Sequence, residues 1–334
     1  MPTSSGSSRA WVIFPQFTGI LARSSPFRAR PSSVIMGGES IPGLPELYML
    51  ETRLGRPEAE RYCEPLQRML DAVLQVGRTE DGLWYSSVDI ETGLPVDRRV
   101  VDTWGYLLGA YHVFDLAEGT QRYADEIQSV MQTIADYRSY PWEGRLQDGY
   151  ADTTESMLYL LPWNDFPEGR EWVDDQIEVM FGMQTSSGFV ESWFLDGNFI
   201  RTALLYAAHK SQGATLSPWR SDVRLGGAPE RTGEGIALYA MAEEPCGGTL
   251  AFDVPRHETF WGMPDDYPRV NAWPEWFAVQ EGTICQVLDF DTGEESLIPG
   301  ESLARGIPLS LGGQNGKSIA IYVSPANRSV EAVR

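Results

Sequence analysis

Apolar positions between residues 57 and 213 recur with the period of an α-helix, and loops that carry Gly and Asp separate the periodic segments. Six helices are predicted, at 61–76, 101–116, 121–137, 152–161, 171–184 and 197–212. The first, third and fifth are apolar on one face, whereas the other three are apolar on nearly every side. Because a helix that is apolar all round needs cover on every side, this alternation predicts two concentric layers. An irregular helical bundle is the alternative.

A turn motif recurs along the same region. It reads DGLWY at 81–85, QDGYAD at 147–152 and LDGNF at 195–199, close to the start of each apolar helix. Repeats of roughly fifty to sixty-five residues match one helical hairpin with its loops. The region therefore has room for three to four hairpins, fewer than a closed ring needs. We expect a partial ring of helical hairpins, an α/α toroid, over residues 41–220.

The pattern changes after residue 213. Residues 221–234 lose periodicity and are rich in Gly, so they are predicted to be a linker. Alternating apolar and polar positions then predict strands at 236–241, 248–254, 275–280, 284–290, 307–313 and 318–324. The fold class is thus mainly α with a β-domain, a partial toroid followed by a small antiparallel β-sandwich at 235–325. Residues 326–334 are expected to be a frayed tail.

Residues 1–40 differ from the rest of the chain. Arg9, Arg23, Arg28 and Arg30 stand among many Ser and Pro residues, and no Asp or Glu occurs before residue 36. This composition is typical of a transit peptide, or of an upstream extension with translation starting near Met36. The segment is expected to be poorly ordered. No run of eighteen apolar residues occurs, so no membrane span is predicted and a soluble protein is expected.

Composition narrows the possible partners. The formal net charge of −21 argues against nucleic acid, because phosphate binding needs a basic surface. Eleven Trp, fourteen Tyr and thirteen Phe suit a sugar-binding cleft, although most of these rings are expected in the core. Three Cys and three His form no metal-ligand motif, so no metal and no cofactor are predicted. At most one disulfide is possible, and Cys246 with Cys285 is its best candidate.

Carboxylates gather at the starts of the apolar helices. Asp148, Tyr150, Asp152 and Glu155 lie around the start of the fourth predicted helix, where Asp152 and Glu155 share a face. Glycoside hydrolysis needs two carboxyl groups, one protonated and one ionised, and burial with mutual repulsion separates their pKa values. Asp152 and Glu155 also fit an N-capping box, which would be a structural role only.

A second polar cluster opens the last predicted helix, with Trp193, Asp196, Asn198 and Arg201. Arg201 lies in an apolar segment and needs an acceptor, for which Asp152 or Glu155 is the obvious partner. It would either hold a substrate carboxylate or form a salt bridge between two hairpins.

Asp102, next to Trp104, opens the second predicted helix in the same way. The hydrolase hypothesis takes Asp152, Glu155 and Asp196 as catalytic candidates. Its substrate-binding candidates are Asp102, Trp104, Asp148, Tyr150, Trp193, Asn198, Arg201 and His257. Lyase chemistry would instead use Tyr150 or His257 as the base, with Asn198 and Arg201 neutralising a uronate carboxylate.

Three segments carry a resemblance to a known superfamily: DTWGYLLGAYHVF at 102–114, LQDGYADTTESMLYLL at 146–161 and WFLDGNFIRTALLYAAHKSQG at 193–213. With the following β-region, the chain from 57 to 325 resembles the six-hairpin glycosidases and the heparinase-like polysaccharide lyases. The resemblance implies a saccharide substrate and an extracellular or periplasmic location. A fainter similarity of residues 183–193 to terpene cyclases lacks the acidic motif of those enzymes.

Because the superfamily also contains proteins without activity, a second hypothesis remains open. The chain would then be a non-catalytic, truncated toroid that binds glycans or a partner chain. An incomplete ring exposes apolar helix faces, and such patches usually mark interfaces, here including one between copies of the chain in a homo-oligomer.

Overall fold

The computed structural model describes residues 33–35, 41–89, 92–190, 197–229, 235–269, 273–290, 292–312 and 319–325. The chain divides into two compact units, Met1–Thr202 with Tyr267–Ala272, and Ala203–Asp266 with Trp273–Arg334. Most of the predicted N-terminal extension and all of the predicted frayed tail lie outside the described residues. Each unit is described by itself below.

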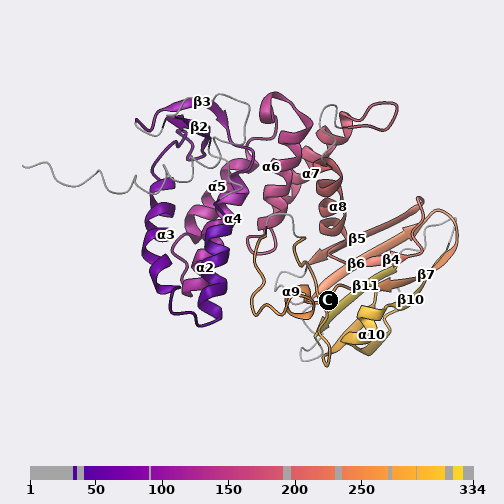
Figure 1. Ribbon diagram of the computed structural model, residues 1–334. Helices are drawn as coiled ribbons and strands as arrows, with labels where there is room; N and C mark the ends of the chain where they lie inside the picture. Colours follow the sequence, from indigo (N-terminus) through magenta and orange to yellow (C-terminus); the bar gives the residue numbers. More distant parts are fainter. Residues whose placement is uncertain are drawn as a thin grey trace, which may run out of the picture. The chain divides into compact units, whose positions relative to one another are not determined.

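Helices dominate the first unit (Figure 1). Their bounds are α2 Gly43–Arg53, α3 Glu60–Val73, α4 Trp104–Glu118, α5 Ala124–Ala135, the short 3-10 turn η2 Trp142–Gly144, α6 Gln147–Leu160, α7 Pro167–Gly182 and α8 Asn198–Ser211, which continues into the second unit. All six predicted helices are confirmed. Only α2 among these α-helices was missed by the sequence pattern.

The connection from α3 to α4 runs through a small antiparallel sheet. Its strands are β1 Ser33–Ile35, β2 Tyr85–Asp89 and β3 Pro95–Val100, in the order β1-β2-β3. The loop before β2 buries Trp84, whose Nε1–H donates to the Val73 carbonyl at 2.9 Å. The Val100 N–H donates to the Tyr140 hydroxyl oxygen at 2.8 Å. This bond fixes the end of β3, from which the chain enters α4.

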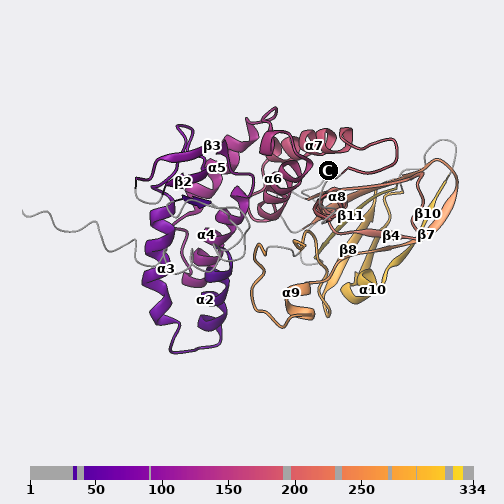
Figure 2. The same ribbon diagram turned by 45° about the horizontal axis from the view of Figure 1, so that its top comes forward.

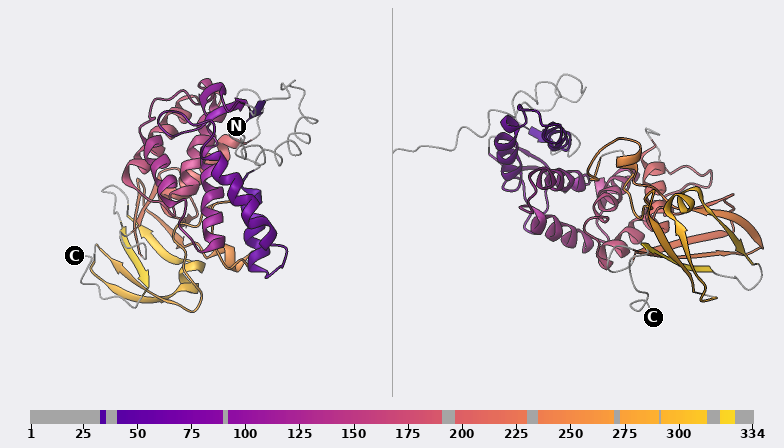
Figure 3. Two further views of the ribbon diagram at one scale, coloured as in Figure 1. Left: turned by 90° about the vertical axis from the view of Figure 1, so that its left-hand side faces the viewer. Right: turned by 90° about the horizontal axis from the view of Figure 1, so that it is seen from below.

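Helices α4 and α6 form the centre of the first unit. Nearly every residue of both is buried, as their all-round apolar character predicts. Helix α4 contacts α2, α5 and α6, while α7 contacts α5 and α6 (Figure 3). The third apolar helix differs, because α8 exposes 58% of Ile200 and 47% of Leu204. The prediction that α8 is covered on every side was therefore wrong.

The second unit is built from antiparallel strands (Figure 2). One sheet has the order β5-β6-β11-β8-β9 and the other the order β10-β7-β4. The bounds are β4 Thr215–Ser217, β5 Val223–Pro229, β6 Ile236–Ala242, β7 Cys246–Ala251, β8 Ile284–Asp289, β9 Glu295–Pro299, β10 Ile307–Leu311 and β11 Ile319–Pro325, with helices α9 Arg256–Thr259 and α10 Gly300–Arg305. Apolar side chains of both sheets share one core with Leu303 of α10.

Three predictions for this region need correction. The linker predicted at 221–234 was wrong for Val223–Pro229, which pairs along its whole length with β6. Its glycines suggested a linker, but at Gly227 they fit a closely packed strand, where an added Cβ would lie 3.0 Å from Leu238 and 3.1 Å from the Ser211 carbonyl oxygen. No strand forms at 275–280, where only an isolated bridge joins Ala278 to Asp253. Cys246 and Cys285 are free thiols on strands of different sheets.

No helix among the described residues is both long and apolar enough to cross a membrane.

The α4–α6 contact can be tested at Gly105. A Cβ on this residue would lie 2.5 Å from the Ser156 Cβ and 2.6 Å from its Cα, so neither helix can yield by moving a side chain alone. We expect Gly105→Ala to lower the free energy of unfolding by about 1–3 kcal/mol in urea titrations. Gly182→Ala is the matched control, since nothing lies within 4 Å of its added Cβ. Equal effects of the two substitutions would contradict the close contact.

Candidate active site

One amide group connects two carboxylates at the start of α6. Asp148 and Asp152 are four residues apart and therefore share a helix face. The Asn198 side chain, at the first residue of α8, donates from Nδ2 to Oδ1 of each at 2.7 Å. Because each of these oxygens is 2.7 Å from the same nitrogen, the Asp148 Oδ1 and Asp152 Oδ1 atoms are separated by no more than the sum of the two hydrogen bonds. The sequence placed these three residues in two separate clusters, and the fold brings them together.

Asp102 joins this group from the turn between β3 and α4. The Ser156 hydroxyl donates to the Asp102 carbonyl at 3.3 Å, which ties the turn to α6. Burial raises the pKa of the Asp102 carboxyl to about 6, and the charge of Asp148 adds to the rise. Burial also raises the pKa of Asp152 well above its usual value, followed by the repulsion of Asp102. Asp102, Asp148 and Asp152 are called the acid cluster below.

Sequence reasoning missed Glu143, whose charge also acts on this group. Glu143 lies in η2 with a φ of 47°, a conformation that few residues other than Gly adopt. It packs on α6 at Gly149, where a Cβ would approach the Glu143 Cβ to 2.5 Å. Burial raises the pKa of Glu143, and the charges of Asp102 and Asp148 raise it further. The sequence offered only Gly149, which it assigned to a turn motif and which the structure places inside α6.

Glu155 has a different environment from the acid cluster. Its side chain is 0% exposed and forms an ion pair with Arg201. The Tyr159 hydroxyl also donates to it, and Tyr106 forms a further hydrogen bond. Burial raises the pKa of Glu155, whereas the Arg201 charge opposes the rise. Glu155 is thus the counter-ion that holds Arg201, and the salt-bridge interpretation of Arg201 is confirmed.

Arg201 also positions the amide that bridges the two aspartates. Its Nη2 donates to Asn198 Oδ1 at 2.6 Å, so the amide oxygen is engaged and Nδ2 must face Asp148 and Asp152. The same nitrogen lies 3.9 Å from Asp152 Oδ1. The buried ion pair therefore determines how the acid cluster is oriented.

The capping-box interpretation was wrong. Helix α6 begins at Gln147 with Leu146 at its N-cap, and no side chain caps it. Asp152 and Glu155 consequently lie in the helix interior, where neither can satisfy the free N–H groups of the first turn. Within this buried helix, Asn198 holds the Asp152 carboxylate and Arg201 holds that of Glu155.

Two aromatic candidates lie in the core. Trp104 is 0% exposed, and its Nε1–H donates to Thr153 Oγ1 at 2.8 Å. Tyr150 is 4% exposed, and its hydroxyl donates to the Tyr140 carbonyl at 3.3 Å. Both rings are therefore buried inside the first unit and do not present a face to a bound sugar.

Three further candidates lie outside the described part of the first unit. Trp193 and Asp196 lie outside the described residues. His257 belongs to the second unit, where Glu275 contacts it.

Arg99 of β3 was not predicted, yet its charge acts on both Asp102 and Glu143. Its guanidinium is exposed and donates to Asp97 from Nε and Nη2, at 2.9 and 2.6 Å.

The chain matches no known protein family, curated protein or solved structure.

The raised pKa of Asp102 predicts a pH-dependent stability. Between its ordinary value of 3.8 and about 6, the folded protein binds the proton more tightly than the unfolded chain. The contribution of this group to stability is therefore complete at low pH and is lost as the pH rises through about 6. Asp102→Asn removes the charge, so we expect it to raise the free energy of unfolding at neutral pH by on the order of 1–3 kcal/mol.

Urea unfolding of both proteins at several pH values checks this expectation. The difference in free energy should shrink as the pH falls from about 6 and be nearly gone below 3.8, the ordinary pKa of an aspartate. A difference that does not depend on pH would show that Asp102 carries no destabilising charge in the folded protein.

Proposed function

We propose that the chain is a carbohydrate-active enzyme that hydrolyses glycosidic bonds in a poly- or oligosaccharide. In this proposal Asp152 is the general acid and Asp102 is the base or nucleophile. The observation that carries it is the acid cluster, in which two half-buried carboxyl groups have raised pKa values and the charge of Asp102 adds to the rise at Asp152. Glycoside hydrolysis requires a pair of carboxyl groups whose environments differ.

The electrostatics of the two groups support these two roles. Burial and the charges of Asp102 and Asp148 raise the pKa of Asp152 well above its usual value, which favours the protonated form that a leaving-group oxygen needs. Asp102, with a pKa raised to about 6, is ionised at neutral pH. Asn198 keeps Asp152 and Asp148 in fixed positions. Such support from neighbouring groups is typical of residues that must be held in one geometry.

The resemblance to the six-hairpin superfamily supports the proposal independently of the charges. We assign the first unit as part of an α/α toroid and the second as its β-sandwich. The acid cluster then lies where the loops enter the central helices, since Asp102 precedes α4 and Asp148 lies in the first turn of α6. Hydrolysis is favoured over the lyase alternative because Tyr150, one of the two lyase bases of the sequence hypothesis, is buried and donates to a backbone carbonyl.

Substitution of the two aspartates tests the proposal. Purified chain is incubated with a panel of polysaccharides and oligosaccharides, and reducing ends are measured, together with ultraviolet absorbance for unsaturated uronates. We expect Asp152→Asn and Asp102→Asn each to lower the rate by about 10²–10⁴-fold, because each removes one step of proton transfer. The wild-type rate should fall as the pH drops below about 6, where Asp102 becomes protonated.

Asp125→Asn is the matched control, since this exposed aspartate lies on α5. It should retain full activity. If the two cluster variants are as active as this control, Asp102 and Asp152 take no part in the mechanism. If the products are unsaturated uronates, the reaction is an elimination and not a hydrolysis.

An exposed apolar patch favours one further candidate function, self-association. Near the end of α7, 45% of Phe181 is exposed, and Phe189 and Ile200 are exposed as well. The Phe181 ring contacts Phe199 with 5.7 Å between centroids, which joins the ends of α7 and α8 into one patch. This hypothesis takes the patch as the open edge of the toroid, covered by a second copy of the chain.

Light scattering tests self-association. We expect the wild-type chain to be a dimer and Phe181→Ser with Ile200→Ser to be a monomer, because the pair of substitutions makes the patch polar. Phe260→Ser, which changes an exposed ring of the second unit, should leave the dimer intact. A monomeric wild-type protein would contradict the hypothesis.

A further inference from the structure

The connection between β7 and β8 in the second unit is held in place by several polar contacts. The Val279 N–H donates to the Asp253 carbonyl at 2.8 Å. Arg256 donates to Asp253 Oδ2 at 2.9 Å and to the Pro274 carbonyl at 2.7 Å. These bonds join the two ends of a long connection and bring the short helix α9 against the segment that contains Glu275.

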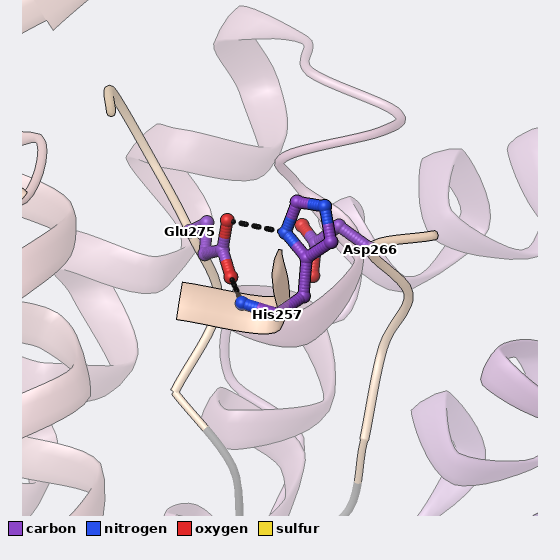
Figure 4. A group of neighbouring side chains, drawn as sticks. All are labelled: His257, Asp266 and Glu275. Atoms are coloured by element: carbon purple, nitrogen blue, oxygen red, sulfur yellow. Dashed lines mark hydrogen bonds and ion pairs between the residues drawn. The ribbon is translucent and has the colours of Figure 1, made fainter. Parts of the chain in front are cut away.

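Three side chains of this connection converge. His257 on α9, Asp266 and Glu275 each offer one ligand atom, and these atoms lie within 4.8 Å of one another. Figure 4 shows the Asp266 carboxylate beside the imidazole ring and Glu275 at its Nδ1. The His257 N–H donates to Glu275 Oε1 at 2.6 Å, and Nδ1 lies 2.8 Å from Oε2. All three residues are half-buried or buried, and none of them belongs to the acid cluster.

We propose that His257, Asp266 and Glu275 form a binding site for a divalent transition-metal ion, with Zn²⁺ as the preferred ion. One imidazole nitrogen with two carboxylate oxygens is a ligand set that suits Zn²⁺ better than Mg²⁺ or Ca²⁺, which prefer oxygen ligands alone. Nothing in the glycoside hydrolysis proposed for the first unit requires this ion.

Distances support a shared ion. Zinc lies about 2.0–2.2 Å from nitrogen and carboxylate oxygen, so two ligands at angles between 90° and tetrahedral are separated by about 3.0–3.5 Å. The 2.8 Å between His257 Nδ1 and Glu275 Oε2 needs only a small opening to reach that range. The ligand atoms of the group lie within 4.8 Å of one another, and rotation of the side chains about their own bonds would bring them to the spacing of zinc ligands.

The Glu275 carboxylate is also held in position, as the ligands of metal sites are. The backbone N–H of His257 holds Oε1, so Oε2 points at the imidazole whether or not the ring carries a proton on Nδ1. Hydrogen bonds of this kind orient metal ligands in known sites. The neighbouring Asp253 carboxylate is paired with Arg256 and is not one of the three ligands. Three protein ligands leave one position for water, as in zinc sites that stay open to small molecules.

Cobalt binding tests the site in the full-length chain. The protein is stripped with a chelator, and Co²⁺ is added while the visible d–d absorption is followed. We expect one Co²⁺ per chain, displaced by Zn²⁺ and not by Mg²⁺. Asp266→Asn should weaken binding at least tenfold, because the amide is a poorer ligand than the carboxylate. Zn²⁺ should also raise the melting temperature of the wild-type chain, and this shift should disappear in Asp266→Asn.

Asp265→Asn is the matched control, because it removes a neighbouring carboxylate that is not part of the group. It should bind Co²⁺ like the wild type. Near-ultraviolet circular dichroism without metal shows that each variant is folded before its binding is compared. A wild-type chain without a saturable cobalt band overturns the proposal. Equal affinity in Asp266→Asn, or binding retained in His257→Gln, places the ion elsewhere and overturns it as well.

Discussion

The candidate site of the first unit depends on the ion pair between Arg201 and Glu155. Glu155 is completely buried, so its charge needs a partner, and Arg201 is that partner. The pair links the middle of α6 to the first turns of α8. Arg201 in turn holds the oxygen of Asn198, and the nitrogen of the same amide holds Asp148 and Asp152. A sequence of charge-assisted hydrogen bonds thus runs from a buried carboxylate to two that are closer to the surface.

This arrangement separates carboxyl groups that are similar in sequence. Glu155 has a cation and two tyrosines around it, whereas burial at Asp102 and Asp152 is combined with other negative charges. The first environment opposes part of the cost of burial, although the pKa of Glu155 is still raised. In the second, neighbouring negative charges add to that cost. This difference is the physical basis for proposing a structural role for Glu155 and a chemical role for Asp102 and Asp152.

Much of the fold was predictable because its helices have clear apolar periods. All six predicted helices exist, and their bounds are wrong by a few residues where loops and helix ends share the same polar residues, as at Asp148 and Asp152. Strand β5 was not predictable because its Gly and Pro residues are also typical of linkers. The acids of the site were predicted individually. Their division of roles was not, because burial and neighbouring charge come from residues distant in sequence.

The unusual backbone of η2 follows from a requirement of α6. Gly149 leaves room for Glu143, because a Cβ there would lie 2.5 Å from the Glu143 Cβ, and Glu143 meets it in a left-handed conformation. The spacing is fixed along the chain, with Gly149 six residues after Glu143 and three before Asp152. A distant relative that has lost overall similarity would still need this glycine between the two acids. The spacing is therefore a signature by which evolutionary relatives of the site can be recognised when the rest of the sequence has diverged.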